Sequence, residues 1–136
     1  MLSDAPDRVV AARVAAARAW IGTPFRLQGR DRYGIDCVGL IAVLHDLTAA
    51  APCRYALRGT PRDQAMATLD RHFVRRSGAV PQVGDILLLR PGMDQLHLGL
   101  WTGVGLVHAH AGLRRVVETP GRPALPLLGI WYQETH

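Results

Sequence analysis

The chain has 136 residues, a length that favours one ordinary domain, spanning residues 1–136, with a single hydrophobic core. Hydrophobic residues make up 49% and charged residues 20%, which is typical of a soluble globular protein and excludes the disordered and collagen-like classes. The net charge of +5 comes from scattered arginines without helix-turn-helix, zinc-finger or stacking-aromatic patterns. We therefore expect no nucleic-acid partner.

The first half of the chain is expected to be helical. Residues 6–21 predict an amphipathic helix, and its apolar stripe consists of Val10, Val14, Ala17 and Ile21. The run CVGLIAVLHDL, residues 37–47, predicts a helix buried on nearly all sides. A more exposed helix is expected over residues 63–75. No stretch approaches the roughly 18 apolar residues of a membrane span, and charges interrupt the N-terminus, so we expect cytoplasmic synthesis without a signal peptide.

The second half of the chain predicts a sheet. A Pro-x-x-Gly-Asp turn at residues 81–85 precedes a change of the hydrophobic period to two. The expected strands are ILLLR (86–90), LHLGLW (96–101), GLVHAH (105–110), LRRVVE (113–118) and GIWY (129–132). Helices followed by an antiparallel sheet indicate an α+β domain.

Cys37 stands at the start of the buried helix. Asp36, directly before it, is a natural N-cap for the free N–H groups of the first turn. A helix N-terminus and a neighbouring imidazolium both lower the pKa of a thiol, so we expect a reactive thiolate here. The same N–H groups are candidate donors to an oxyanion. Cys37 is therefore a candidate nucleophile.

Three histidines in the predicted sheet are candidate partners for this thiol. The period-two rule places His97 on one face of its strand and His108 and His110 together on one face of the next. A turn at residues 102–103 sets His97 opposite His108, whereas a turn at residues 103–104 sets it opposite His110 and diagonal to His108. Either register keeps all three on one face, where one histidine can act as base while a second orients it.

The same residues are also compatible with a metal site or with simple packing. Three histidines and a thiolate can bind zinc, but the ligands lack the short spacings of a metal site, so we expect no metal. His110 is interpreted as a packing residue. Cys37 and Cys53 are both expected to be free thiols, and Cys53 to be inert.

The ordered motifs GTPF, GIDCVGL, VGDILLL, LHLGLW and LVHA, between about Ala16 and Tyr132, resemble the NlpC family of papain-like cell-wall cysteine peptidases. The resemblance implies Cys37 as nucleophile, His97 as base and His108, in preference to His110, as the orienting residue. It implies cleavage of the bond between γ-D-glutamate and a diamino acid in peptidoglycan stem peptides. No metal or organic cofactor is needed for this chemistry.

The sequence departs from the family at two positions. Most members have serine after the cysteine and tyrosine after GTP, whereas this chain has Val38 and Phe25. Polar recognition of the substrate near the nucleophile is therefore expected to differ, with Tyr33 as one replacement hydroxyl. Trp101 lies on the same face of its strand as His97 and is expected to line the catalytic cleft. The candidate substrate-binding residues are Phe25, Tyr33, Asp36, Val38 and Trp101.

The GIDCVGL form, the RRVVE strand and the expected lack of a signal peptide are similar to family members encoded with phage tail genes and gene-transfer particles. This similarity implies phage tail proteins as partners, and a place in the virion or delivery to the cell wall, without membrane insertion. Two other functions stay open. One is a non-catalytic structural or wall-binding tail component, and the other is a thiol amidase or acyltransferase with a different substrate.

Overall fold

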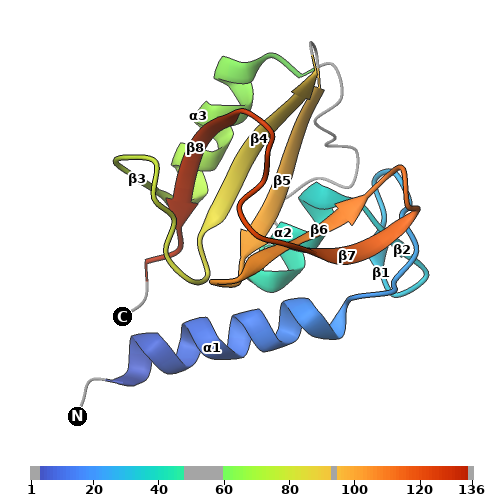
Figure 1. The fold of residues 1–136 in the computed structure, drawn as a ribbon, viewed down its shortest axis with the longest axis horizontal. Helices are drawn as coiled ribbons and strands as arrows, with labels where there is room; N and C mark the ends of the chain where they lie inside the picture. The colour runs from blue at the N-terminus through green and yellow to red at the C-terminus, as the bar shows by residue number, and fades with distance from the viewer. Residues whose placement is uncertain (1–3, 48–59, 93–94, 135–136) are drawn as a thin grey trace.

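The structure is a computed structural model that describes residues 4–47, 60–92 and 95–134 (Figure 1). Its helices are α1 (Asp4–Ala19), α2 (Cys37–Leu44) and α3 (Arg62–His72). Its strands are β1 (Arg30–Asp31), β2 (Gly34–Ile35), β3 (Val74–Arg76), β4 (Ile86–Gly92), β5 (Gln95–Trp101), β6 (Gly105–His110), β7 (Arg115–Pro120) and β8 (Leu127–Tyr132). The predicted α+β class is confirmed. No helix in the described ranges has the length and apolar character needed to cross a membrane.

The larger sheet has the strand order β3-β8-β4-β5-β6-β7, and each neighbouring pair is antiparallel. β8 lies inside the sheet between β3 and β4, so the chain crosses the surface after β7 and returns to the middle of the sheet, as Figure 1 shows. β1 and β2 form a separate small hairpin directly before α2. This order places β5 and β6, which carry the candidate histidines, next to each other.

The core lies mainly between the helices and one face of the sheet. α2 and α3 pack on the same face, where Leu40 and Leu69 join Ile86, Leu100 and Trp131 in one buried cluster. The other face carries a smaller cluster, which consists of Leu87, Leu89, Trp101, Leu106 and Ile130. Side chains on both faces of the central strands are therefore buried, and this explains why these strands are long runs of apolar residues.

Two predicted elements end earlier than the sequence suggests. α1 ends at Ala19, so Ile21 leaves the apolar stripe and is 44% exposed in the following turn. α3 ends at His72, and residues 74–76 form β3 instead of a last helical turn. The cause is tertiary, because β3 pairs with β8, a strand more than fifty residues later in the chain.

The predicted turn at residues 81–85 fixes the start of the central strands. Gly84 has a φ of 90°, a left-handed conformation that favours glycine. The buried Asp85 carboxylate accepts a hydrogen bond from the N–H of Gln82 and two from the Arg76 guanidinium, at 2.7 and 3.0 Å. The motif VGD is therefore explained by turn geometry and a bidentate ion pair that ties β3 to β4.

His45 follows α2 and is buried against Phe73. Its Nδ1 lies 2.7 Å from the carbonyl oxygen of Ile41, and burial lowers its pKa to about 4. In the unfolded chain the pKa is near 6.5. The unfolded state therefore takes up a proton first as the pH falls, and the stability that neutral His45 contributes is lost between about pH 6.5 and pH 4.

We expect His45 to lower the free energy of unfolding by about 2 to 3 kcal/mol when the pH falls from 7.5 to 4.5. Urea denaturation at pH 7.5 and pH 4.5 measures it. His45→Gln, which keeps an N–H donor, should reduce the pH dependence by that amount, whereas His72→Gln, at an exposed site, should not. An unchanged pH dependence in His45→Gln would contradict the assignment.

Candidate active site

The β1–β2 hairpin delivers Asp36 to the start of α2, where it caps the helix. Its Oδ1 accepts the N–H of Gly39 at 2.8 Å, which confirms the predicted N-cap. The same carboxylate accepts hydrogen bonds from Arg30 at 2.8 Å and from the N–H of Gln28 at 2.7 Å. Because each oxygen has an internal partner, Asp36 holds the loop and the helix together beside Cys37.

Cys37 is the first residue of α2, and its side chain is half-buried against the main cluster. Burial raises the pKa of its thiol to about 12, and the nearby Asp36 carboxylate acts in the same direction. Hydrogen bonding from the backbone at Leu98, Val38 and Cys37 itself lowers the pKa but does not outweigh burial. The expectation of a lowered thiol pKa is therefore wrong, because desolvation opposes the charged form more strongly than the helix N-terminus favours it.

The thiol reaches the sheet where β5 and β6 separate. Their ladder pairs Leu100 with Val107 and Trp101 with Leu106 and extends no further. The N–H of Thr102 points toward β6, because it bonds to the carbonyl of Gly105. Every second N–H along β5 points the same way, so the N–H of Leu98 also faces the β6 side, at a position beyond the end of the ladder. α2 contacts both strands, and the backbone of Leu98 lies near enough to the Cys37 thiol to lower its pKa. This places the thiol beside the residue that follows His97.

His97 and His108 are in direct contact. Nε2 of His97 lies 2.7 Å from Nδ1 of His108, and the two rings meet edge to face with centroids 4.9 Å apart. The hairpin turns at residues 103–104, so His108 lies diagonal to His97, as the second of the two predicted registers requires. The bond to His108 occupies Nε2 of His97, so Nδ1 is the ring nitrogen that is not bonded to His108. No hydrogen bond between Cys37 and His97 themselves occurs in the described structure.

Both histidines are neutral at ordinary pH. Burial is the main cause that lowers the pKa of His97 to about 3, and His108 and His110 add to it. Burial, followed by the effect of His110, lowers the pKa of His108 to about 4. The resting site therefore holds a protonated thiol next to neutral imidazoles, one of which has a free lone pair.

Thr119 is a site residue that sequence reasoning missed. Its Oγ1 lies 2.8 Å from Nε2 of His108, so the contacts continue from β5 through β6 to β7. The strand was expected to end at Glu118, whereas β7 runs to Pro120. Extending the period-two pattern by one residue would have placed Thr119 on the face of Val117, which pairs with His108.

The predicted substrate-binding residues lie in different surroundings. Phe25 lies next to β2 through a bridge to Ile35 and packs half-buried on the core. Tyr33 is 85% exposed at the tip of the β1–β2 hairpin. Val38 is 8% exposed and packs in the main cluster, so its apolar side chain serves the core and leaves little surface for a substrate. The substrate-binding roles of these residues and of Asp36 stay predictions.

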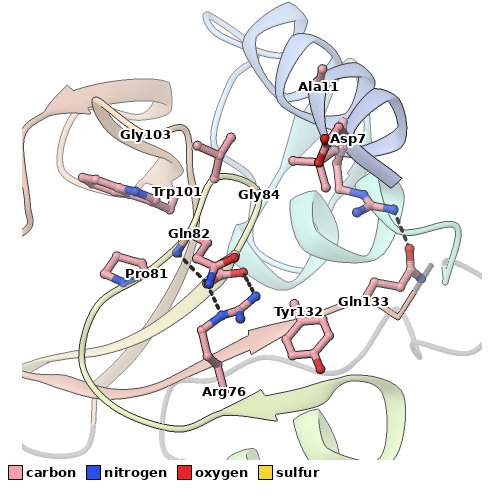
Figure 2. Close-up of a pocket in the computed structure, with 14 residues that line it drawn as sticks. Asp7, Ala11, Arg76, Pro81, Gln82, Gly84, Trp101, Gly103, Tyr132 and Gln133 are labelled. Atoms are coloured by element: carbon pink, nitrogen blue, oxygen red, sulfur yellow. Dashed lines mark hydrogen bonds and ion pairs between the residues drawn. The ribbon is translucent and has the colours of Figure 1, made fainter. Parts of the chain in front are cut away.

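Trp101 lies at the other end of β5, four residues or roughly 13 Å from His97. It is buried in the smaller cluster and lines a cavity of about 680 Å³ between α1 and the turn at residues 81–85 (Figure 2). Arg76 and Tyr132 line the same cavity, and Cys37, His97 and His108 are not among its lining residues. The placement therefore gives no support to Trp101 as a wall of the catalytic cleft.

The remaining candidates have other partners or fall outside the described ranges. His110 accepts the N–H of Leu113 at Nδ1, and its ring centroid lies 5.4 Å from that of His108. Within the described part of the chain, no group of three or more His, Cys, Asp or Glu side chains is arranged to hold a metal ion. Cys53 lies outside the described residues.

Solved structures with the same arrangement of elements include several NlpC/p60 proteins. The NlpC/p60 domain of the peptidoglycan hydrolase SagA is 26% identical, with a TM-score of 0.55, over 82% of this chain and 88% of that one. The chain has the NlpC/p60 fold. The peptidoglycan hydrolase RipB from Mycobacterium tuberculosis shares this fold at 21% identity and a TM-score of 0.63, over 98% of this chain and 68% of that one.

A further NlpC/p60 structure, NlpC2 from Trichomonas vaginalis, matches at 14% identity and a TM-score of 0.68, over 91% of this chain but only 46% of its own length. No family model and no curated relative matches the sequence. The likeness to the SagA domain supports the NlpC family that the sequence motifs predict, and the other two structures share the fold.

Proposed function

We propose that this protein is a cysteine peptidase that hydrolyses the amide bond between γ-D-glutamate and a diamino acid, commonly meso-diaminopimelate, in peptidoglycan stem peptides. One arrangement carries the proposal: the Cys37 thiol meets β5 at Leu98, and the adjacent His97 is bonded to His108. SagA and RipB, which are described as peptidoglycan hydrolases, support the substrate class. The order of motifs from GTPF to LVHA supports the cleaved bond.

The pKa values favour proton transfer during attack over a resting thiolate. Cys37 and His97 both begin neutral, because the thiol pKa is raised to about 12 and the imidazole pKa is lowered to about 3. As the sulfur attacks the amide carbonyl, its proton moves to Nδ1 of His97. The transfer places a positive charge on His97 next to the negative charge that develops on the reacting groups. The attraction between these charges in a site of low dielectric offsets much of the cost of desolvating them. Substrate binding is expected to bring the thiol and the imidazole into hydrogen-bonding contact.

The reaction then follows two balanced steps. The bond between the Cys37 sulfur and the carbonyl carbon forms, the carbon–nitrogen bond breaks, and His97 gives its proton to the leaving amine. Water next attacks the thioester and gives one proton to His97, the carbon–sulfur bond breaks, and His97 returns this proton to the sulfur; the released carboxylic acid loses its own proton to solvent. The N–H groups of the first turn of α2 are the proposed donors to the oxyanion.

Replacing Cys37 by alanine should abolish this reaction, with a loss of about 10⁴-fold or more in kcat. The substrate is a defined tetrapeptide that contains γ-D-glutamyl-diaminopimelate, and mass spectrometry follows its products. Cys37→Ala also serves as the control for contaminating activity. Equal product release by wild type and Cys37→Ala would refute the peptidase function.

A wall-binding role without turnover is the second candidate. The observations that favour it are the raised pKa of the Cys37 thiol and the lack of a hydrogen bond from that thiol to His97 in the described structure. Retention on purified peptidoglycan, equal for wild type and Cys37→Ala and without released peptides, would establish it.

We also propose that the protein acts with phage tail or gene-transfer particles and reaches the cell wall with them. The support is the similarity of GIDCVGL and RRVVE to members encoded with tail genes. Mass spectrometry of purified particles tests this, and particles that lack the protein would refute it.

A further inference from the structure

The hydrogen-bonded chain that begins at His97 continues past His108. His97 Nε2 and His108 Nδ1 are 2.7 Å apart, and His108 Nε2 is 2.8 Å from Oγ1 of Thr119. We propose that Thr119 is a positioning residue, which fixes the tautomer of His108 and thereby selects the nitrogen of His97 that acts as base. The kinetic part of this proposal rests on the proposed peptidase function, whereas the tautomers are measurable without turnover.

The tautomers of the two histidines are linked, because a single hydrogen lies between their facing nitrogens. If His108 carries its hydrogen on Nε2, its Nδ1 accepts, and His97 donates from Nε2. The lone pair of His97 is then on Nδ1, the nitrogen available to Cys37. If His108 carries its hydrogen on Nδ1, that hydrogen points at His97, whose own hydrogen then sits on Nδ1 and blocks proton uptake there. The His108 tautomer therefore decides whether His97 is a base toward the thiol.

Thr119 supplies an acceptor where the productive tautomer needs one. A hydroxyl has one hydrogen and two lone pairs. Thr119 is exposed, so its hydrogen can point into solvent while a lone pair faces Nε2–H of His108. Once His97 is protonated it donates from Nε2 to Nδ1 of His108, so His108 must keep its hydrogen on Nε2 throughout the reaction. Acceptance by Thr119 stabilises this state.

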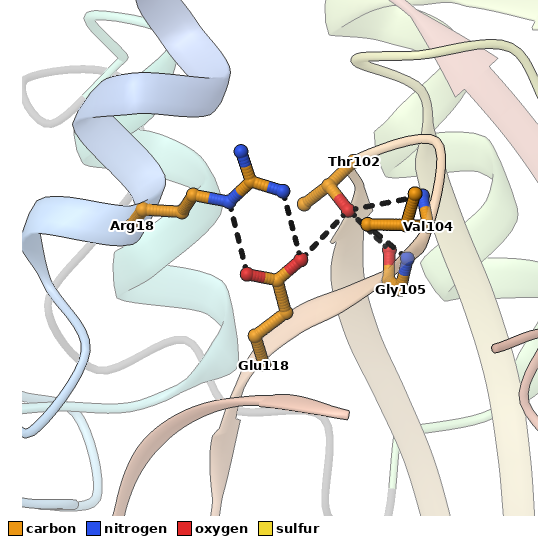
Figure 3. Close-up of polar contacts among 5 residues, drawn as sticks. All are labelled: Arg18, Thr102, Val104, Gly105 and Glu118. Carbon is orange, nitrogen blue, oxygen red and sulfur yellow. Dashed lines mark hydrogen bonds and ion pairs between the residues drawn. The ribbon is translucent and has the colours of Figure 1, made fainter. Parts of the chain in front are cut away.

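The strand that carries Thr119 is held in place on both sides of the residue. The preceding Glu118 accepts two hydrogen bonds from Arg18 of α1, at 2.9 and 3.0 Å, and one from Thr102 at 2.9 Å (Figure 3). After Thr119, the N–H of Gly121 bonds to the carbonyl of Val104 at 2.8 Å. Thr119 also pairs with Leu106 in the β6–β7 ladder. These contacts hold the backbone of Thr119 in register with the strand that carries His108.

The tautomers of His97 and His108 are determined from long-range ¹H–¹⁵N correlation spectra of the ¹⁵N-labelled protein at pH 7. In the wild type we expect both His97 and His108 to carry hydrogen on Nε2. Thr119→Val removes only the hydroxyl and suits an exposed strand, so the fold should persist. In this variant we expect His108 to show a mixture of tautomers or hydrogen on Nδ1. Thr119→Ser should restore the wild-type spectrum.

The kinetic consequence is a loss of kcat in Thr119→Val of about ten-fold or more with KM unchanged, and recovery in Thr119→Ser. Thr68→Val makes the same chemical change on α3 and should alter neither readout. Hydrogen on Nδ1 of His108 in the wild type, or unchanged tautomers in Thr119→Val, overturns the proposal. Altered tautomers with no turnover by the wild type would leave the role of Thr119 at His108 intact and refute the peptidase function instead.

Discussion

Replacing His97 by alanine should lower kcat for stem-peptide cleavage by about 10³-fold or more, because no base then stands next to Cys37. His97 is the residue before Leu98, whose backbone lowers the pKa of the nearby thiol, and Nδ1 of His97 is the ring nitrogen that is not bonded to His108. Initial rates at saturating tetrapeptide measure the effect. Thermal unfolding of the same variant measures any loss of stability separately from the loss of rate.

His110→Ala is the matched control for this variant. His110 lies on the same strand and face as His108, but it bonds to the N–H of Leu113 and makes no bond to His97. We expect its kcat to stay within a few-fold of the wild type. Equal losses in His97→Ala and His110→Ala would show that general disruption of this face, and not the loss of a base, lowers the rate.

Asp36→Ala should lower the free energy of unfolding by about 3 to 5 kcal/mol, the largest effect on stability expected here. The Asp36 and Arg30 side chains are 4% and 8% exposed, and the 2.8 Å ion pair between them is therefore buried. The variant removes the charge that compensates Arg30, the cap of α2 and the acceptor for the N–H of Gln28. Urea denaturation at pH 7 measures the change.

Two further variants show which contact matters. Asp36→Asn keeps a good N-cap and removes only the charge, so its loss should be smaller than that of Asp36→Ala. Asp63→Ala removes a carboxylate that is 97% exposed and 4.0 Å from Arg62, and the stability should barely change. If Asp36→Ala were as stable as Asp63→Ala, the buried ion pair would not hold the site together.

The parts of the site that depend on local rules were predictable from the sequence. A helix that starts at Cys37 with Asp36 as its cap follows from the residue types alone, and the structure confirms both. The alternation along two strands places the histidines on one face, and the contact between His97 and His108 is present. The choice between the two hairpin registers did not follow from these rules, because residues 102–104 allow either turn.

The ionisation of the site was not predictable, because it depends on tertiary burial. A cysteine at a helix N-terminus suggests a lowered pKa, yet packing against the sheet raises the pKa of Cys37. The same burial lowers the pKa of His97 and His108. Thr119 was missed because the strand was expected to end one residue earlier, and its contact with His108 depends on the pairing of β7 with β6.

The protonated state of the Cys37 sulfur has a consequence for its chemical lifetime. Peroxide and disulfides react with thiolates, so a sulfur with a pKa near 12 forms sulfenic acid or mixed disulfides slowly. In the proposed mechanism, its nucleophilicity appears only when a bound amide draws the proton onto His97. In surroundings that oxidise ordinary cysteines, the protein would thus keep its sulfur intact without a reducing partner.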